Sequence, residues 1–144
     1  GYWGNPAATA QEFTDGYWHS GDVGAVDAEG YLSVRDRKKD MINRGGYKVY
    51  SAEVEGVLAE HPAVLESAVV GFPCPVLGER VRAVVTVREA VEGGNAALGL
   101  GEALRAFCAA RLADYKVPEA FTLRTEPLPR NANGKVLKRE LRES

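Results

Sequence analysis

The spacing of apolar and polar residues changes near residue 40 and divides the chain into two parts. Residues 1–39 are rich in glycine, aromatic and turn-forming residues, with a short strand pattern at 30–35 and no helical period. We interpret them as the end of a β-rich unit. From Asp40 onward helical and strand patterns alternate, so a second domain is expected over residues 40–144.

The second part opens with two short strand patterns followed by a helix. Strands are expected around residues 41–42 and 47–49, and Ser51 is expected to be the N-cap of a helix. Pro62 should end this helix. Its buried stripe follows the i, i+3, i+4, i+7 spacing of an amphipathic helix, on Val54, Val57, Leu58 and His61.

Two longer strands and a second helix are expected next. The strands are predicted at residues 64–71 and 80–88, and alternation in the second predicts one face in contact with water. Residues 92–101 resemble a loop of small residues, and a third strand is predicted at 120–124. Between these two segments the apolar face of a helix is marked by Leu104, Phe107, Cys108 and Leu112.

The chain ends in a polar loop that leads into a short helix. This segment covers residues 127–144, with Leu137 and Leu141 expected to point inward. The complete order of strands and helices predicts an α+β fold in which helices pack on a small mixed sheet.

Composition excludes several classes of function. The chain has 144 residues, 45% of them hydrophobic, which is enough for one ordinary core, or for a small core plus part of a neighbouring domain. Lysine and arginine number 18 against 20 acidic residues, so no net basic field attracts nucleic acid or an anionic membrane. No signal peptide opens the chain and no apolar run approaches the roughly 20 residues that span a bilayer.

The cysteines and the amino-terminal aromatic residues are expected to be structural. Cys74 and Cys108 lack metal-ligand spacing, which favours reduced packing residues and a cytoplasmic protein. The absence of a basic stripe favours packing over base stacking for Tyr2, Trp3, Tyr17 and Trp18. His19 and His61 have neither triad partners nor metal spacing, so no role is assigned to them.

One lysine near the carboxyl terminus is a candidate for chemistry. Asn133 and Gly134 predict a turn that presents Lys135 immediately before the last helix. A lysine on such a turn is usually only solvated. Alternatively, its ammonium could serve as a mobile positive charge for phosphate and carboxylate oxygens.

Three other segments also allow two interpretations. Asp22 could bind a ribose diol or only stabilise a turn, and the charged run 35–40 could be a hinge beside a nucleotide contact or a solvated connector. Gly45 and Gly46, followed by Tyr47, could form an ordinary turn or allow close backbone approach to a thin ligand. The spacing of residues does not choose between these alternatives.

Taken together and in this order, three motifs resemble the adenylate-forming superfamily, which includes acyl-CoA synthetases, luciferases and the adenylation domains of peptide synthetases. The motifs lie at residues 16–22, at 36–49 with 52–55, and at 129–141. The resemblance spans nearly the whole chain. The first and third motifs look more like free-standing CoA ligases than peptide-synthetase modules, and Asn43, where luciferases typically have a lysine, argues against light emission.

The resemblance implies a role for several residues. Asp22 would bind the ribose hydroxyls of ATP and AMP, Arg37 would contact the nucleotide, and Lys39 would lie at the hinge between a large amino-terminal domain and a small mobile domain. Lys135 would stabilise the transition state of adenylation. After rotation of the small domain, the loop formed by Gly45, Gly46 and Tyr47 would replace the lysine and line the CoA thiol channel.

The resemblance also implies what lies outside this chain. The acyl pocket, the phosphate-binding loop and the magnesium ligands are expected in a missing amino-terminal domain, which is therefore the expected partner, and the chain alone is expected to be inactive. The substrates would be a carboxylic acid, ATP and CoA. The alternatives are an amino-acid or aryl-acid adenylation domain that loads a carrier protein, and a non-catalytic α+β interaction domain.

Overall fold

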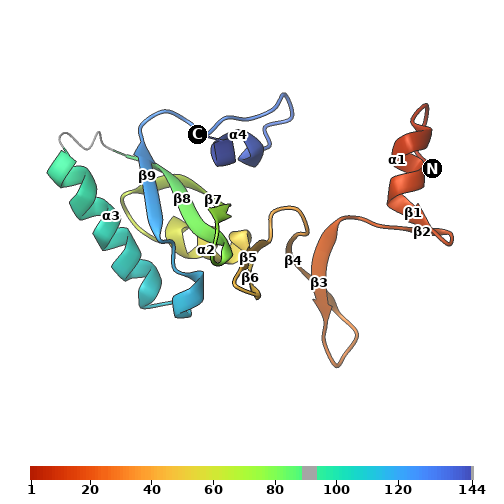
Figure 1. Cartoon of the computed structure of the whole chain (residues 1–144), viewed down its shortest axis with the longest axis horizontal. Helices are drawn as coiled ribbons and strands as arrows, with labels where there is room; N and C mark the ends of the chain where they lie inside the picture. The colour runs from red at the N-terminus through yellow and green to blue at the C-terminus, as the bar shows by residue number, and fades with distance from the viewer. Residues whose placement is uncertain (89–93, 144) are drawn as a thin grey trace. The chain divides into compact units, whose positions relative to one another are not determined.

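The computed structural model describes residues 1–88 and 94–143. Its chain divides into two compact units, Gly1–Lys39 and Asp40–Ser144 (Figure 1). The interpretation of the first unit as the end of a large domain, and of Lys39 as the hinge, stays a prediction.

The first unit contains one helix and two small hairpins. Its elements are α1 (Pro6–Glu12), β1 (Phe13–Thr14), β2 (Tyr17–Trp18), β3 (Asp22–Val26) and β4 (Leu32–Arg37), with β1 paired to β2 and β3 paired to β4. The sequence pattern missed α1. Its start is nevertheless encoded locally, because the Asn5 side chain accepts a hydrogen bond from the Ala8 N–H (3.0 Å) and Pro6 is the first helical residue.

The second unit has the predicted α+β architecture. Its elements are β5 (Ile42–Arg44), β6 (Tyr47–Val49), α2 (Ser51–Ala59), β7 (Val64–Cys74), β8 (Gly78–Val87), α3 (Gly94–Ala109), a 3₁₀ turn (Asp114–Lys116), β9 (Ala120–Arg124) and α4 (Lys138–Glu143). The strand order is β6-β5-β8-β7, and β9 pairs in parallel with β8 while the other pairs are antiparallel. The small mixed sheet flanked by helices is therefore confirmed.

One face of the sheet forms the main core with α2 and α3. Leu58 from α2 and Leu104 from α3 are completely buried, together with Val81 and Val85 from β8. Cys108 is buried on the same side of α3, and both cysteines are free thiols. Burial of several large aliphatic side chains, each contributing about 1.5–3 kcal/mol, is the dominant force that holds these helices to the sheet.

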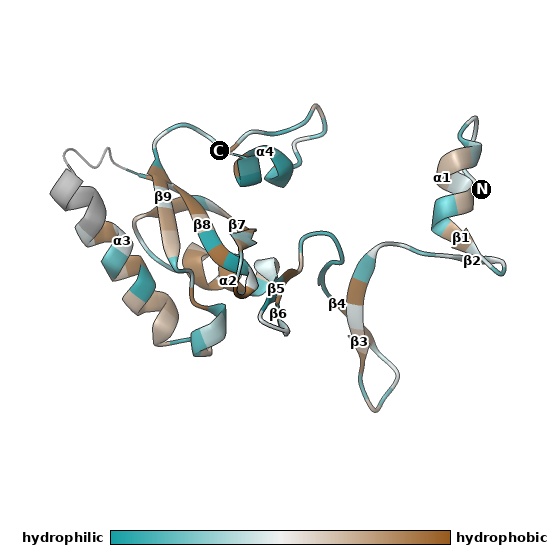
Figure 2. Cartoon of the chain, in the orientation of Figure 1, coloured by the Kyte–Doolittle hydropathy of each residue, from teal (hydrophilic) through white to brown (hydrophobic). Residues whose placement is uncertain are grey.

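The prediction that one face of the strand at 80–88 contacts water holds only at its ends, where Arg80 and Arg88 are exposed, and was wrong for the middle of the face. Leu141 of α4 packs with Val84 of β8, Val70 of β7 and Leu128 in a second cluster of buried residues. Thr86, on the same face, is only 3% exposed and its hydroxyl donates to the Glu126 carbonyl oxygen (3.1 Å). The middle of the face is covered because α4, distant in sequence, folds over it (Figure 2).

The limits of the two longer helices also differ from the prediction. Tyr50 is the N-cap of α2 and makes no side-chain cap hydrogen bond, whereas Ser51 is buried inside the helix. The segment expected to be a loop at 92–101 belongs to α3 from Gly94 onward, and residues 92–93 lie outside the described part. The glycine content of this segment therefore misled the prediction.

Of the amino-terminal aromatic residues expected to pack, Tyr2 lies edge-on against Phe13 (ring centroids 5.9 Å apart), whereas the others are mostly exposed. Trp3 and Tyr17 are fully or largely exposed in the first unit, and the Trp18 indole N–H donates to the Tyr2 hydroxyl at 3.0 Å. His61 is half-buried and packs edge-on against Phe107, with ring centroids 5.0 Å apart.

Within the described residues, no helix is both long and apolar enough to cross a membrane.

Candidate functional site

The hairpin of β3 and β4 brings Asp22 and Arg37 together. They are cross-strand partners, and the Arg37 Nε lies 2.9 Å from the Asp22 Oδ1. Arg37 also donates to the Ser20 carbonyl oxygen (3.1 Å), and the Lys38 N–H donates to the Gly21 carbonyl oxygen (2.7 Å). The carboxylate and the guanidinium are thus held side by side across the open end of one hairpin, two residues before Lys39, where the first unit ends.

Asp22 and Arg37 also line an open depression of about 960 Å³ within the first unit. Its wall includes Glu12, Trp18 and His19. Small-molecule sites commonly measure about 300–1,000 Å³. The side chains of Asp22 and Arg37 are 32% and 47% exposed, so both can still reach a polar ligand in this depression.

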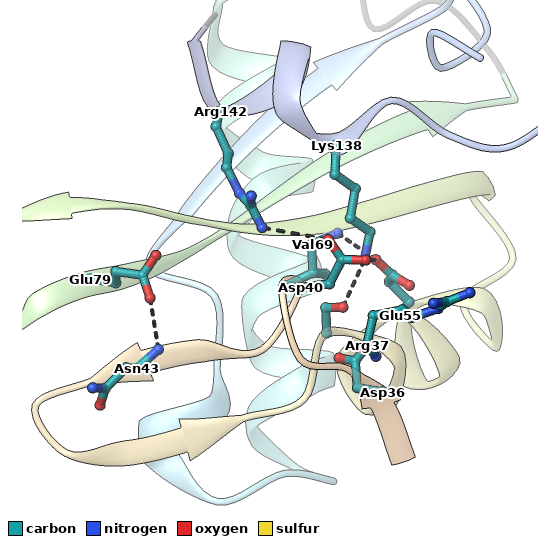
Figure 3. Close-up of polar contacts among 10 residues, drawn as sticks. Asp36, Arg37, Asp40, Asn43, Glu55, Val69, Glu79, Lys138 and Arg142 are labelled. Atoms are coloured by element: carbon teal, nitrogen blue, oxygen red, sulfur yellow. Dashed lines mark hydrogen bonds and ion pairs between the residues drawn. The ribbon is translucent and has the colours of Figure 1, made fainter. Parts of the chain in front are cut away.

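Gly45 and Gly46 form the tip of the β5–β6 hairpin. Arg44 pairs with Tyr47, and both glycines have positive φ angles, +58° and +90°, as a type I′ turn requires. The Gly46 N–H donates to the Asn43 side-chain oxygen (3.1 Å), and the Asn43 N–H donates to Glu79 (2.8 Å; Figure 3). Asn43 therefore stabilises the glycine turn.

The hairpin tip also has a neighbouring turn and an aromatic contact. The Gly45 N–H donates to the carbonyl oxygen of Leu77, in the turn between β7 and β8 (2.8 Å). In the same turn, hydrogen bonds from the backbone N–H groups of Leu77 and Val76 lower the pKa of the Cys74 thiol. Tyr47 is exposed but stacks on Tyr115, with ring centroids 4.8 Å apart. The tip of the hairpin is therefore held in place yet accessible.

Lys135 lies on an exposed turn between β9 and α4, and this turn is organised by Asn131. The Asn131 side-chain oxygen accepts from the N–H groups of Asn133 (3.1 Å) and Lys135 (2.9 Å), and Gly134 has a φ of +77°. The Asn131 N–H also donates to the Lys135 carbonyl oxygen (2.9 Å). Within the described residues, the Lys135 ammonium makes neither a hydrogen bond nor an ion pair, so it can contact a ligand.

Glu66 on β7 holds the upstream end of this loop. Its Oε1 accepts from the Leu128 N–H (2.7 Å), and its Oε2 pairs with the Arg130 guanidinium. Burial opposes ionisation of this carboxyl, but the Leu128 N–H and Arg130 outweigh it, and the pKa of Glu66 is lowered from its ordinary value of 4.5. Glu66 is therefore a charged anchor for the loop at neutral pH.

Polar contacts to α2 hold the downstream end. The Lys138 Nζ lies 2.7 Å from the Glu55 Oε1 and 2.7 Å from the Ser51 hydroxyl (Figure 3). The same Glu55 oxygen accepts from the Val69 N–H at 2.8 Å. Arg142 pairs with Asp40 at 3.6 Å, so both ends of α4 are tied to the remainder of the unit.

Sequence reasoning missed Asn131, Arg130, Glu66 and Glu55. Asn131 had a local signal, because asparagine commonly bonds to backbone groups two residues further on. The partners of Arg130 and Lys138 are 64 and 87 residues away, and no local pattern reveals them. Lys135 and the glycine turn lie on separate loops of the second unit, β9–α4 and β5–β6.

These features agree with a family relationship. The family model for the "AMP-binding enzyme C-terminal domain" matches residues 53–135, more than half of the chain. The chain belongs to this family of adenylate-forming enzymes. The match extends from the first turn of α2 to Lys135.

Similar curated proteins are acid–CoA ligases. The chain is 44% identical over 143 residues to a long-chain-fatty-acid–CoA ligase of Bacillus subtilis, covering 99% of the chain and 24% of that ligase. It is 46% identical over 142 residues to a feruloyl-CoA synthase of an Amycolatopsis species, covering 99% of the chain and 28% of the synthase. The chain thus spans about a quarter of the length of the relatives it matches.

A solved structure agrees in fold. The o-succinylbenzoate CoA synthetase of Bacillus subtilis, in complex with the acyl-adenylate intermediate OSB-AMP, superposes with a TM-score of 0.84 at 37% identity, over 99% of the chain and 28% of that enzyme. The sequence relatives and the solved structure therefore agree on the family of CoA ligases.

A magnesium ion is bound mainly by carboxylate and other oxygen ligands. Among residues 1–88 and 94–143, no group of three or more His, Cys, Asp or Glu side chains could hold a metal. These residues do not fit a magnesium site, and the expectation that the magnesium ligands lie in another domain stays a prediction.

Proposed function

We propose that this chain is the carboxyl-terminal portion of a cytoplasmic acid–CoA ligase and that it acts together with a large amino-terminal domain. In the first half-reaction, a carboxylate oxygen attacks the α-phosphorus of ATP, and acyl-AMP forms as pyrophosphate leaves. In the second, the sulfur of CoA attacks the acyl carbon, and AMP leaves. The observation that carries this proposal is the exposed Lys135 on its Asn131-organised turn, in a chain whose relatives are CoA ligases.

Asp22 and Arg37 would bind the nucleotide. Asp22 uses one carboxylate oxygen for Arg37, and hydroxyl groups of a ribose can donate to the other. The cross-strand ion pair fixes the carboxylate in advance, which lowers the ordering cost of nucleotide binding. Arg37, which is half exposed, adds a positive charge that suits a phosphate.

Lys135 would act in the first half-reaction. Negative charge accumulates on the phosphate oxygens as the new P–O bond forms and pyrophosphate departs. A preorganised ammonium stabilises this charge more in the transition state than in the ground state, which is what accelerates a step. The exposed position of Lys135 allows its ammonium to reach substrates held by another domain.

The β5–β6 hairpin would act in the second half-reaction. Both glycines at its tip lack side chains, and a Cβ built on Gly46 meets no atom within 4 Å, so a thin thiol-bearing arm can pass close to the backbone. Lys135 and this tip lie on separate loops, so we propose that the unit rotates about Lys39 to present them in turn.

A carrier-protein thiol is the alternative acceptor, as in peptide-synthetase adenylation domains. The test is to incubate the intact enzyme with ATP and a panel of fatty and aryl acids, and to measure AMP release with free CoA or with a phosphopantetheinylated carrier. We expect AMP release to depend on free CoA. AMP release only with the carrier would favour the alternative acceptor. If no acid supported AMP release and an acyl-adenylate analogue did not bind the intact protein, a non-catalytic interaction domain would be favoured.

The isolated 144-residue chain is expected to be inactive, because the residues that bind the triphosphate and the acid are expected in the amino-terminal domain. Pyrophosphate exchange by the chain alone, at a rate near that of the intact enzyme, would contradict this division of labour.

A further inference from the structure

The loop that carries Lys135 cannot be fixed by burial. Residues 131–135 are all exposed, and the apolar side chains nearest to them in sequence, Leu128 and Val136, lie at its base. An exposed loop without apolar anchors samples many conformations unless polar contacts restrict it. The conformation of Lys135 therefore depends on hydrogen bonds and ion pairs.

Arg130 links this loop to the sheet. Its Nη1 donates to the carbonyl oxygen of Gly134, the residue before Lys135, at 2.8 Å. Its Nη2 pairs with Glu66, whose other oxygen accepts from the Leu128 N–H. One guanidinium therefore connects the turn of Lys135 to a carboxylate on β7, an edge strand of the sheet.

The backbone around Arg130 continues the same connection. Arg130 and Val136 form an isolated antiparallel bridge, and the Leu137 N–H donates to the Pro129 carbonyl oxygen at 2.8 Å. The loop is thus a closed hairpin-like turn with its two sides paired. Arg130 bonds across this turn and also reaches outside it, to Glu66.

We propose that Arg130 and Glu66 are positioning residues for Lys135. The planar guanidinium of Arg130 bridges the Gly134 carbonyl oxygen and the Glu66 carboxylate, and this bridge fixes the direction in which the Lys135 ammonium points. This inference rests on the proposed role of Lys135 in adenylation. The bridge needs two donors held in a fixed plane, which arginine has and lysine lacks.

The bridge should affect one half-reaction only. A displacement of about 1 Å at a catalytic group can lower a rate by roughly 100-fold. Arg130→Met is therefore expected to lower the adenylation rate by about 10- to 100-fold with little change in the KM for ATP. Transfer from supplied acyl-AMP to CoA should stay within about twofold, because the glycine turn is on another loop.

The experiment uses the intact enzyme and measures the two half-reactions separately for five variants. These are Arg130→Met, Arg130→Lys, Glu66→Gln, Lys135→Ala and the double variant Arg130→Met with Lys135→Ala. The matched control is Arg139→Met, whose side chain is 89% exposed on α4 and pairs with Glu143 on the same helix. Arg130→Lys should retain the positive charge near Glu66. It should nevertheless lower the adenylation rate almost as much as Arg130→Met does, because one ammonium cannot replace the planar bridge.

The double variant decides whether Arg130 acts through Lys135. Once Lys135 is removed, Arg130→Met should lower adenylation by less than about twofold further. The inference would be overturned if Arg130→Met lowered adenylation in the double variant by as large a factor as it does when Lys135 is present. Normal adenylation in Arg130→Met and Glu66→Gln would also overturn it. Either result would leave the role of Lys135 intact. Normal adenylation by Lys135→Ala would instead contradict the proposed function. Should Arg130→Met fail to fold, Glu66→Gln and Arg130→Lys provide the same comparison.

Discussion

The contact between Glu55 and Lys138 should be the main polar anchor of α4. Glu55 accepts hydrogen bonds from the Lys138 ammonium and from the Val69 N–H, and the two charged side chains are only 24% and 15% exposed. Glu55→Met removes the acceptor for both groups and introduces an apolar chain of similar length. The change therefore leaves a buried backbone donor and a largely buried ammonium with fewer partners.

The size of the effect follows from these two losses. A buried N–H without an acceptor costs about 1–3 kcal/mol, and a buried ion pair that loses one partner costs about 3–5 kcal/mol. Lys138 retains the Ser51 hydroxyl at 2.7 Å and some contact with water, so its share should be smaller. We expect Glu55→Met to lower the free energy of unfolding by about 3 kcal/mol.

The assay is equilibrium urea unfolding of the 144-residue chain, followed by far-UV circular dichroism, together with hydrogen exchange at the Val69 amide. The matched control is Glu60→Met, a glutamate just after α2 that is 66% exposed and lies 3.7 Å from Arg111. This control should change stability by less than about 0.5 kcal/mol. The reasoning is refuted if both variants lose the same stability and the Val69 amide keeps its protection in Glu55→Met.

Three further predictions concern the other anchors and the hairpin. Because the native pKa of Glu66 is lowered from 4.5, its contribution to stability is complete above about pH 4.5 and is lost as the pH falls through the native pKa. The difference in unfolding free energy between the wild-type chain and Glu66→Gln should therefore shrink below about pH 4.5, and a difference that grows on acidification would contradict the ion pair. Gly46→Leu places a side chain at a φ of +90° beside the proposed thiol path, so transfer to CoA should fall by about tenfold or more while adenylation persists. Gly56→Leu in α2, where a Cβ also meets nothing within 4 Å, is the control, and equal losses in both half-reactions of Gly46→Leu would count against the thiol path. Lys39→Pro fixes φ at the proposed hinge and should block thioester formation selectively, whereas Lys39→Ala should not. A Lys39→Pro enzyme with normal thioester formation would remove the hinge assignment.

The elements that the sequence predicted well are those whose patterns are local. The third strand was predicted at residues 120–124, as observed for β9, where Phe121 and Leu123 alternate with polar residues. The buried positions Val54 and Leu58 of α2 followed from helical spacing alone. The glycine turn was predicted from composition, and its two positive φ angles explain that composition.

The features that it missed depend on distant partners. Ser51 has the chemistry of an N-cap, but its hydroxyl instead accepts a hydrogen bond from Lys138, 87 residues later. The outer face of β8 contains arginines and a threonine, so alternation alone predicted water along its whole length, yet α4 covers the middle of that face. The motif around Lys135 drew attention to the lysine, whereas the residues that hold its turn, Asn131 and Arg130, act through contacts that the structure had to supply.

The central claim is that Lys135 serves adenylation and not thioester transfer. The most direct measurement is the rate of each half-reaction in the intact enzyme for Lys135→Ala, with Lys138 and its contact to Glu55 left unchanged. Removal of a transition-state charge contact should lower the formation of acyl-AMP by about 100-fold or more, while transfer from supplied acyl-AMP to CoA proceeds at the wild-type rate. An equal loss in both half-reactions, or normal formation of acyl-AMP, would contradict the account.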